Sequence, residues 1–272
     1  MDDIDKAQYA EVLRSLPTLM DLMKYAGNVH MFWFMQRREA FLSEECLGKW
    51  NRKRLDQYVL LPIAFKSVIR SECHFVSHFW QQSDSPDPNG HSLQLVQKQL
   101  AGQAWSYVWI DWTCLPQAPR SAVETVYFDR ALSTMPAIIQ EASFISTYPS
   151  WEPRLWILFE VAHFGATGDP SEDWISQPDV APYIMHMFEM VQSNGVRAII
   201  DRYGYKCTQP FDQALITFWL ELLILFGQIG LDKADVCKFV TNMTFQPGAG
   251  HLKYTSLDAS FELWQFEGLL LH

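Results

Sequence analysis

The sequence has few cysteines, and no two of them have the spacing of a metal or redox motif. Its five cysteines are scattered, and none forms a Cys-x-x-Cys pair. This pattern excludes a disulfide framework and a zinc site built on such pairs. Scattered thiols are typical of reduced, buried cysteines inside cells, so we expect a cytoplasmic location.

Long apolar runs are also missing. The longest run, ALITFWLELLILFG (214–227), is shorter than a membrane span and contains Glu221. It predicts a buried core helix, and we expect no association with membranes. The first residues, MDDIDKAQYAEVL, are acidic and polar, and they lack the apolar centre of a secretory signal.

The common motifs of nucleotide and hydrolase sites are absent. There is no Gly-x-Gly-x-x-Gly sequence and no Walker loop, which excludes ordinary Rossmann and P-loop nucleotide binding. Ser77 lacks the Gly-x-Ser-x-Gly surroundings of a hydrolase nucleophile. No spacing of His, Cys, Asp or Glu predicts a metal site.

Positive charge is scarce. The chain has 21 Lys and Arg against 31 Asp and Glu, and the net charge of −10 argues against a general nucleic-acid binder. Residues 36–54 are a local exception. We interpret this segment as a solvated helix face. The alternative is a contact with tRNA through Arg37, Arg38, Arg52, Lys53 and Arg54.

Aromatic residues are abundant. They make up 14% of the 272 residues, with 11 Trp and 18 Phe, and hydrophobic residues make up 49%. Such a chain buries enough apolar surface to fold, so disorder is excluded as its main state. We expect a large core that is rich in rings.

Hydrophobic periodicity predicts an α/β protein. Short apolar runs predict strands over 73–78, 106–112 and 142–147, with helices between them and another helix beginning at 154. Alternation of strands and helices is typical of a parallel sheet with right-handed crossovers. We therefore expect an α/β domain over 71–205, a helical N-terminal extension over 1–70, and a helical C-terminal part over 206–272. A short strand over 196–201 is also expected.

Polar and aromatic side chains follow each predicted strand. Open parallel sheets bind ligands outside the carboxyl ends of their strands, so we expect one shared cleft there. The candidate catalytic residues are His78, Asp111 and Glu160, and the candidate substrate-binding residues are Ser77, Trp80, Trp112, Arg154 and Trp156. Each has a structural alternative: a core histidine, a turn-capping aspartate or core tryptophans.

Glu160 is the most unusual of these residues. It is the one carboxylate in RLWILFEVAHF (154–164), a segment expected to be a buried helix, and it shares a face with Trp156. An isolated buried carboxylate is costly, so it is paired, protonated or used in chemistry. The chemical role is general acid–base catalysis or stabilisation of positive charge. The structural role is a pairing with Arg154 or a backbone amide.

The order of motifs resembles that of the heterokaryon-incompatibility (HET) domain and the related TIR domain. The segments that carry this resemblance are FVSHFW, YVWIDWTCLPQ and RLWILFE, within residues 72–165. The loop SHFW…PDPNG is also similar to a loop of stand-alone proteins of this kind. The resemblance implies a flavodoxin-like, TIR-like sheet and a nucleotide-sized cleft. It also implies that Glu160 is the catalytic group of an NAD-cleaving reaction.

Three functions are compatible with these patterns. The first is an enzyme that cleaves or transfers at a nucleotide such as NAD, which would be a substrate; no other cofactor is expected. The second is a biosynthetic enzyme on the same fold, for example one that forms cyclic dipeptides from aminoacyl-tRNA. The third is a signalling module without catalysis that assembles through its surface, and a homo-oligomer is one expected state.

Overall fold

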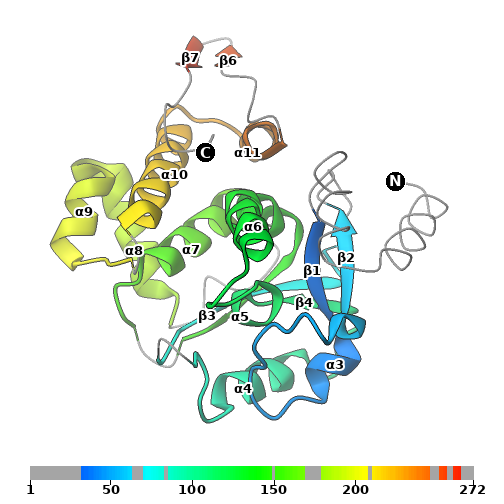
Figure 1. Cartoon of the computed structure of the whole chain (residues 1–272). Helices are drawn as coiled ribbons and strands as arrows, with labels where there is room; N and C mark the ends of the chain where they lie inside the picture. Colours follow the sequence, from blue (N-terminus) through cyan, green and yellow to red (C-terminus); the bar gives the residue numbers. More distant parts are fainter. Residues whose placement is uncertain are drawn as a thin grey trace. The chain divides into compact units, whose positions relative to one another are not determined.

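A five-stranded sheet organises the first of two structural units, Met1–Thr147 and Tyr148–His272 (Figure 1). The computed structural model describes residues 32–62, 70–82, 85–148, 151–168, 179–207, 210–245, 251–255 and 260–264. The predicted segment limits at 70 and 205 stay predictions.

The sheet is mixed, with strand order β2-β1-β4-β3-β5. Its strands are β1 (Phe32–Arg37), β2 (Tyr58–Pro62), β3 (Cys73–His78), β4 (Tyr107–Trp109) and β5 (Ser143–Thr147). β3 is parallel to β4 and to β5, whereas β1 is antiparallel to both β4 and β2. Four strands therefore point one way and β1 points the other way. The α/β class expected from the sequence is confirmed.

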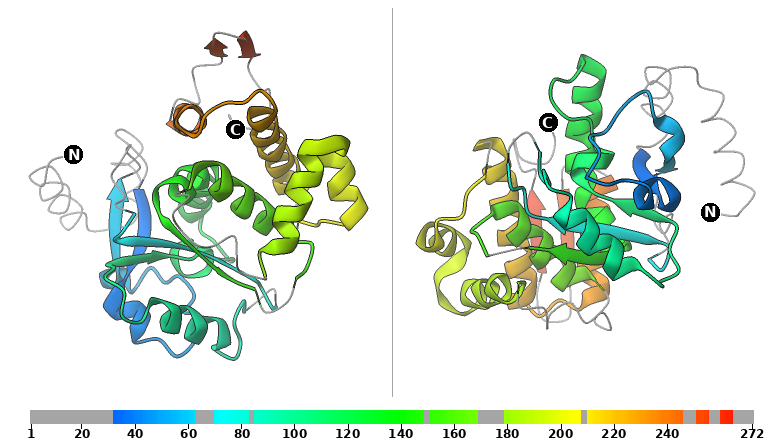
Figure 2. Two further views of the ribbon diagram at one scale, coloured as in Figure 1. Left: turned by 180° about the vertical axis from the view of Figure 1, so that it is seen from behind. Right: turned by 90° about the horizontal axis from the view of Figure 1, so that it is seen from below.

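Two helices connect the parallel strands on opposite faces of the sheet. α4 (His91–Leu100) leads from β3 to β4, and α6 (Ala122–Glu141) leads from β4 back across β3 to β5. Figures 1 and 2 show α4 against one face and α6 against the other. Right-handed crossovers in opposite directions require this arrangement. The direction of the strand order reverses at β3, so the carboxyl ends of β3 and its neighbours form the topological switch point of the sheet.

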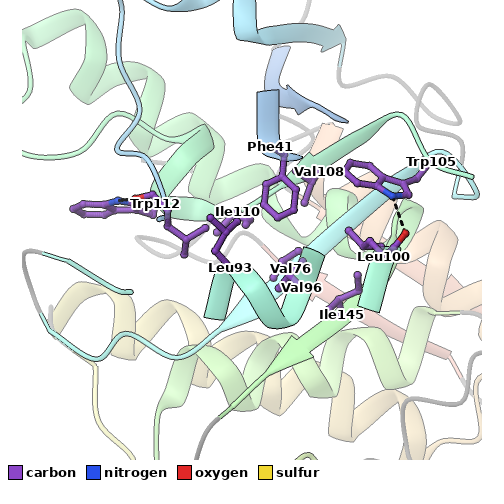
Figure 3. Packing of buried hydrophobic residues seen from close by; sticks show 11 residues of the cluster. Phe41, Val76, Leu93, Val96, Leu100, Trp105, Val108, Ile110, Trp112 and Ile145 are labelled. Carbon is purple, nitrogen blue, oxygen red and sulfur yellow. Dashed lines mark hydrogen bonds between the residues drawn. The ribbon is translucent and has the colours of Figure 1, made fainter. Parts of the chain in front are cut away.

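β3 is buried on both faces, and its side chains alternate between two cores. On the α6 face, the Phe75 ring stacks with Trp109 at 5.0 Å and with Phe144 at 5.9 Å between centroids. On the α4 face, Val76 packs with Leu93 and other residues of an apolar cluster (Figure 3). All six residues of β3 are buried, which explains the continuous apolar run in the sequence.

The loop PDPNG forms the start of α4. The buried carboxylate of Asp87 accepts hydrogen bonds from the amides of Ser92 (3.0 Å) and Leu93 (2.9 Å), which lack partners inside the helix. Gly90 has a φ of 67°, and a Cβ there would lie 2.3 Å from the carbonyl oxygen of Glu45. Asp87 and Gly90 of this loop therefore have a structural role, which is to form the start of α4.

Local signals also explain the start of α6. Ser121 and Glu124 form a reciprocal capping box, in which each side chain bonds the other residue's backbone amide. Arg52 donates to the buried Glu124 carboxylate at 2.7 Å. The helix expected between the strands predicted at 106–112 and 142–147 is confirmed.

The prediction of helices throughout residues 5–70 is wrong for β1 and β2. FWFMQR (32–37) is a short apolar run that fits a buried helix turn or a strand equally well, and pairing with β4 decides for the strand. Between β1 and β2 the chain forms only α3 (Arg38–Leu42) and a 3-10 turn (Leu55–Gln57). Residues 1–31 and 63–69 lie outside the described part.

The strand expected over 106–112 is shorter in the structure. β4 ends at Trp109, and the short helix α5 (Asp111–Cys114) begins directly after it. β4 nevertheless lies inside the sheet, between β1 and β3. The strands predicted at 73–78 and 142–147 are confirmed.

The second unit is mainly helical. Its elements are α7 (Leu155–Thr167), α8 (Ala181–Glu189), a π-helical turn (Met190–Asn194), α9 (Gly195–Tyr203), α10 (Pro210–Gln228), α11 (Lys233–Phe245), β6 (His251–Thr255) and β7 (Ser260–Trp264). α7 packs against α8, α10 and α11. β6 and β7 pair as an antiparallel hairpin, so the part expected to be helical over 206–272 also contains ten residues of strand.

The strand expected over 196–201 is also wrong, because these residues belong to α9. Val196, Ile199 and Ile200 are buried on one face, at the i, i+3, i+4 spacing of a helix. The apolar run 214–227 lies within α10, whose residues 215–220 are all buried, as expected for a core helix. Among the residues that the structure describes, no helix has the length and apolar character needed to cross a membrane.

Candidate functional site

The ends of the parallel strands β3 and β4 bring together His78, Trp80 and Asp111. His78 is the last residue of β3, and Trp80 follows it. Asp111 is the first residue of α5, just after β4. Because β3 and β4 are parallel neighbours, their carboxyl ends meet at one edge of the sheet.

The Asp111 carboxylate is held by three donors. Its Oδ1 lies 2.7 Å from His78 Nε2 and accepts the backbone amide of Trp112 at 2.6 Å, and its Oδ2 accepts the Trp80 indole N–H at 3.0 Å. The side chain of Asp111 is 36% exposed, whereas that of His78 is 3% exposed. We call His78, Trp80, Asp111 and Trp112 the Asp111 cluster.

Within this cluster His78 orients Asp111. An ionised carboxylate only accepts hydrogen bonds, so Nε2 of His78 carries the proton in their contact. The other ring nitrogen, Nδ1, is buried and has no hydrogen-bond partner among the residues described. Asp111 is therefore the group of the pair that faces solvent.

The two tryptophans of the cluster are locked in place. Their rings meet edge to face, with centroids 5.1 Å apart at 89°. Trp112 is buried, lies at one end of the apolar cluster in Figure 3, and donates its indole N–H to the carbonyl of Leu47 at 3.2 Å. Trp80 is only partly buried. A buried ring thus supports a second ring that stands next to the carboxylate.

The surrounding loops complete this frame. Trp50 donates its amide to the carbonyl of Trp112 at 3.1 Å, and the ammonium of Lys49 lies 5.4 Å from the centre of the Trp112 ring. Gln117 donates to the main-chain carbonyl of Asp111 at 2.9 Å. Sequence reasoning missed the contribution of residues 47–50. Gln117 is the last residue of the motif YVWIDWTCLPQ, and this position could have marked it as part of the site.

Ser77 does not belong to this cluster. It is buried, and it pairs with Ser146 of β5. Because side chains alternate along a strand, Ser77 and His78 point to opposite faces of the sheet. The strand geometry therefore disfavours a direct role for Ser77 beside Asp111.

The other three candidates lie in the second unit. Arg154 precedes α7 and pairs with Glu152 at 3.5 Å, and Trp156 donates its indole N–H to Asp212 at 3.1 Å. Burial raises the pKa of the Asp212 carboxyl. No local pattern pointed to this aspartate. Asp212 lies 56 residues after Trp156 in the sequence, so no local pattern links the two residues.

Glu160 lies on α7 and is only half-buried, although Phe159 and Val161 on either side are fully buried. Burial, with a smaller contribution from the charge of Glu160, raises the pKa of the Tyr183 phenol. Glu160 is therefore close enough to Tyr183 for their charges to interact. A shared cleft for Glu160 and the Asp111 cluster stays a prediction.

The basic segment is partly used inside the first unit. Arg38 donates to the carbonyl of Trp105 at 3.3 Å and stacks over its ring, and Arg52 pairs with Glu124. The remaining residues of the predicted tRNA contact are exposed: Arg37, Lys53 and Arg54. Two of the five basic residues thus have structural partners.

Comparisons with known proteins do not add a relative. No family model, no curated protein and no solved structure matches the chain. Within the residues that the structure describes, no three His, Cys, Asp or Glu side chains are grouped to hold a metal ion. The function is therefore argued from the Asp111 cluster and from Glu160.

Proposed function

We propose that this protein is an enzyme with a flavodoxin-like, TIR-like sheet that cleaves or transfers at a nucleotide such as NAD. The single observation that carries the proposal is a solvent-facing carboxylate, Asp111, fixed at the carboxyl edge of parallel strands. Open α/β sheets bind ligands at this edge. The central position of β3 among the three parallel strands supports the flavodoxin-like assignment.

The chemistry suits such carboxylates. Cleavage of the bond between nicotinamide and ribose transfers the electron pair of that bond to the base and leaves positive charge on the ribose. A carboxylate held in place stabilises this charge or captures it, and water or another nucleophile then completes hydrolysis or transfer. Because three donors already hold Asp111, little reorganisation is needed during the reaction.

Glu160, in the second unit, is proposed as a catalytic group in its own right. The resemblance to the TIR domain assigns it the acid–base or charge-stabilising role. Its partial exposure on an otherwise buried helix is compatible with contact to a ligand. Arg154 and Trp156, on the same helix start, are proposed to help bind the substrate.

The test compares Asp111→Asn and Glu160→Gln with the wild type, with release of nicotinamide from NAD as the measurement. We expect each variant to lose about 10²-fold or more in turnover. Asp111→Asn should cost about 1–2 kcal/mol of stability, because the amide NH₂ then faces a donor. Asp56→Asn, at an exposed carboxylate of the same unit, is the matched control and should keep full activity. No NAD cleavage by the wild type, or full turnover in both variants, would contradict the proposal.

Aminoacyl-tRNA is the second substrate to assay, because Arg37, Lys53 and Arg54 are exposed. Binding of RNA through these residues would weaken steeply with salt. If neither substrate is turned over and Glu160→Gln changes no property, a module without catalysis becomes the better interpretation.

A further inference from the structure

Two of the three donors that hold the Asp111 carboxylate are uncharged groups. The Trp80 indole and the Trp112 amide are neutral donors. The third donor is Nε2 of His78, whose other ring nitrogen, Nδ1, is buried without a hydrogen-bond partner in the described structure. No lysine or arginine among the described residues forms an ion pair with Asp111. Lys49 instead donates to the carbonyl of Ala118 at 2.6 Å.

One acceptor position of Asp111 stays available. A carboxylate offers about four lone-pair sites. Oδ1 has two donors, whereas Oδ2 has one, the Trp80 indole. The side chain as a whole is 36% exposed, so the carboxylate is reached from solvent. A ligand can therefore approach a fixed anion without displacing any of its donors.

An aromatic surface stands beside this anion. Trp80 is partly buried, and its ring lies nearly parallel to His78 at 6.3 Å and edge to face with Trp112. The buried rings support Trp80 from within, so its orientation next to Asp111 is set before a ligand arrives. A carboxylate next to an indole face is the combination that attracts organic cations. Divalent metal ions need several oxygen ligands, which two indoles do not supply.

We infer that the Asp111 cluster binds a positively charged organic group, with Asp111 as the counter-ion and Trp80 as the aromatic surface. The choice of site rests on the proposed function, in which the oxidised nicotinamide ring is such a group. The inference goes beyond the proposed function, because it requires the site to bind cations more tightly than neutral molecules even when no reaction follows.

The experiment is calorimetric titration of the full chain with two pairs of probes. The first pair is the 1-methyl-3-carbamoylpyridinium ion and neutral nicotinamide. The second pair is choline and its uncharged isostere 3,3-dimethylbutan-1-ol. We expect each cation to bind about tenfold or more tightly than its neutral partner. Asp111→Asn should reduce this preference to the part that the Trp80 ring supplies, and Asp56→Asn should keep it in full.

Variants of Trp80 keep the inference testable if Asp111→Asn fails to fold. Trp80→Phe keeps an aromatic face and should keep the preference for cations. Trp80→Leu keeps apolar volume without the ring and should reduce it by about three- to tenfold. His78→Ala removes one donor of Asp111 and should weaken binding of the cations, and His78→Gln, which restores a donor, should recover part of it, as expected for a positioning residue.

The outcomes separate this inference from the proposed function. Equal binding of cations and neutral isosteres, or no binding of either, overturns the inference even if NAD is cleaved. A preference that stays undiminished in Asp111→Asn also overturns it. Preference for cations that depends on Asp111, without any NAD cleavage by the wild type, supports the inference and rejects the proposed function.

Discussion

Two histidines on the same face of β3, His74 and His78, have different surroundings. His78 Nε2 contacts a carboxylate at 2.7 Å. His74 packs against the Trp105 ring at 6.2 Å, and its Nδ1 is buried without a hydrogen-bond partner among the described residues. Burial therefore lowers the pKa of His74 to about 4. His78, at the end of the strand, thus positions the Asp111 carboxylate, whereas His74, at its beginning, fills the core.

His74 should make the protein sensitive to acid. Its pKa is lower in the folded than in the unfolded state, so the unfolded state binds more protons between the two values. Stability is then complete above about pH 6.5 and decreases toward about pH 4, by up to about 3 kcal/mol from this residue. Denaturant unfolding at pH 7.5 and pH 4.5 measures the loss. His74→Phe keeps a ring against Trp105 and should lose less stability on acidification. An equal loss in wild type and variant would show that other groups are responsible.

At the scale of the element, α4 depends on a side chain that precedes it. Asp87 accepts the amides of Ser92 and Leu93, in the first turn of a helix that places Leu93, Val96 and Leu100 in the core. The carboxylate also suits the positive end of the helix dipole. Because α4 covers one face of the sheet, its start affects the packing of the whole face.

Asp87→Ala should lower the free energy of unfolding by about 1–2 kcal/mol, because two buried amides lose their acceptor. Asp87→Asn keeps one acceptor oxygen and should show an intermediate loss. Urea denaturation gives both values. Gln94→Ala, at an exposed position of α4, is the control and should change stability by less than about 0.5 kcal/mol. If Asp87→Ala matches this control, the cap does not stabilise the helix.

At the scale of the whole molecule, residues far apart in the chain form one sheet and its cover. The buried Trp33 of β1 donates its indole N–H to Thr134 of α6 at 3.1 Å, across 101 positions of the sequence. The Tyr127 hydroxyl of α6 accepts the amide of Phe34 at 3.1 Å. β1 is thus an integral strand of the first unit. It pairs with β4 on one side and is covered by α6.

Trp33→Ala should destabilise the first unit by about 3–5 kcal/mol, because it leaves a large cavity and removes the bond to Thr134. Trp151→Ala is the control. It removes an indole that is 37% exposed, and it should cost much less. Thermal unfolding followed by near-ultraviolet circular dichroism compares the two. A small effect of Trp33→Ala would mean that β1 contributes little to the folded unit.

The sequence by itself determined the elements that have strong local signals. β3 and β5 are short, bounded apolar runs, and α6 begins with a capping box, so their positions follow from nearby residues. The placement of His78 and Asp111 after parallel strands was also predictable, since that rule needs only the order of elements. The type of β1 and α9 was not, because short apolar runs fit both helix and strand.

Only the tertiary structure decided how the site is assembled. His78 and Asp111 are 33 residues apart, and their contact exists because β4 pairs beside β3 in one particular register. Which of the two faces solvent depends on how deeply each lies in the sheet, and no local pattern encodes that depth. Likewise, Asp212 meets Trp156 only because α10 packs against α7. Local propensity acts over a few residues, whereas the charge and exposure of a site depend on contacts between segments that the sequence keeps far apart.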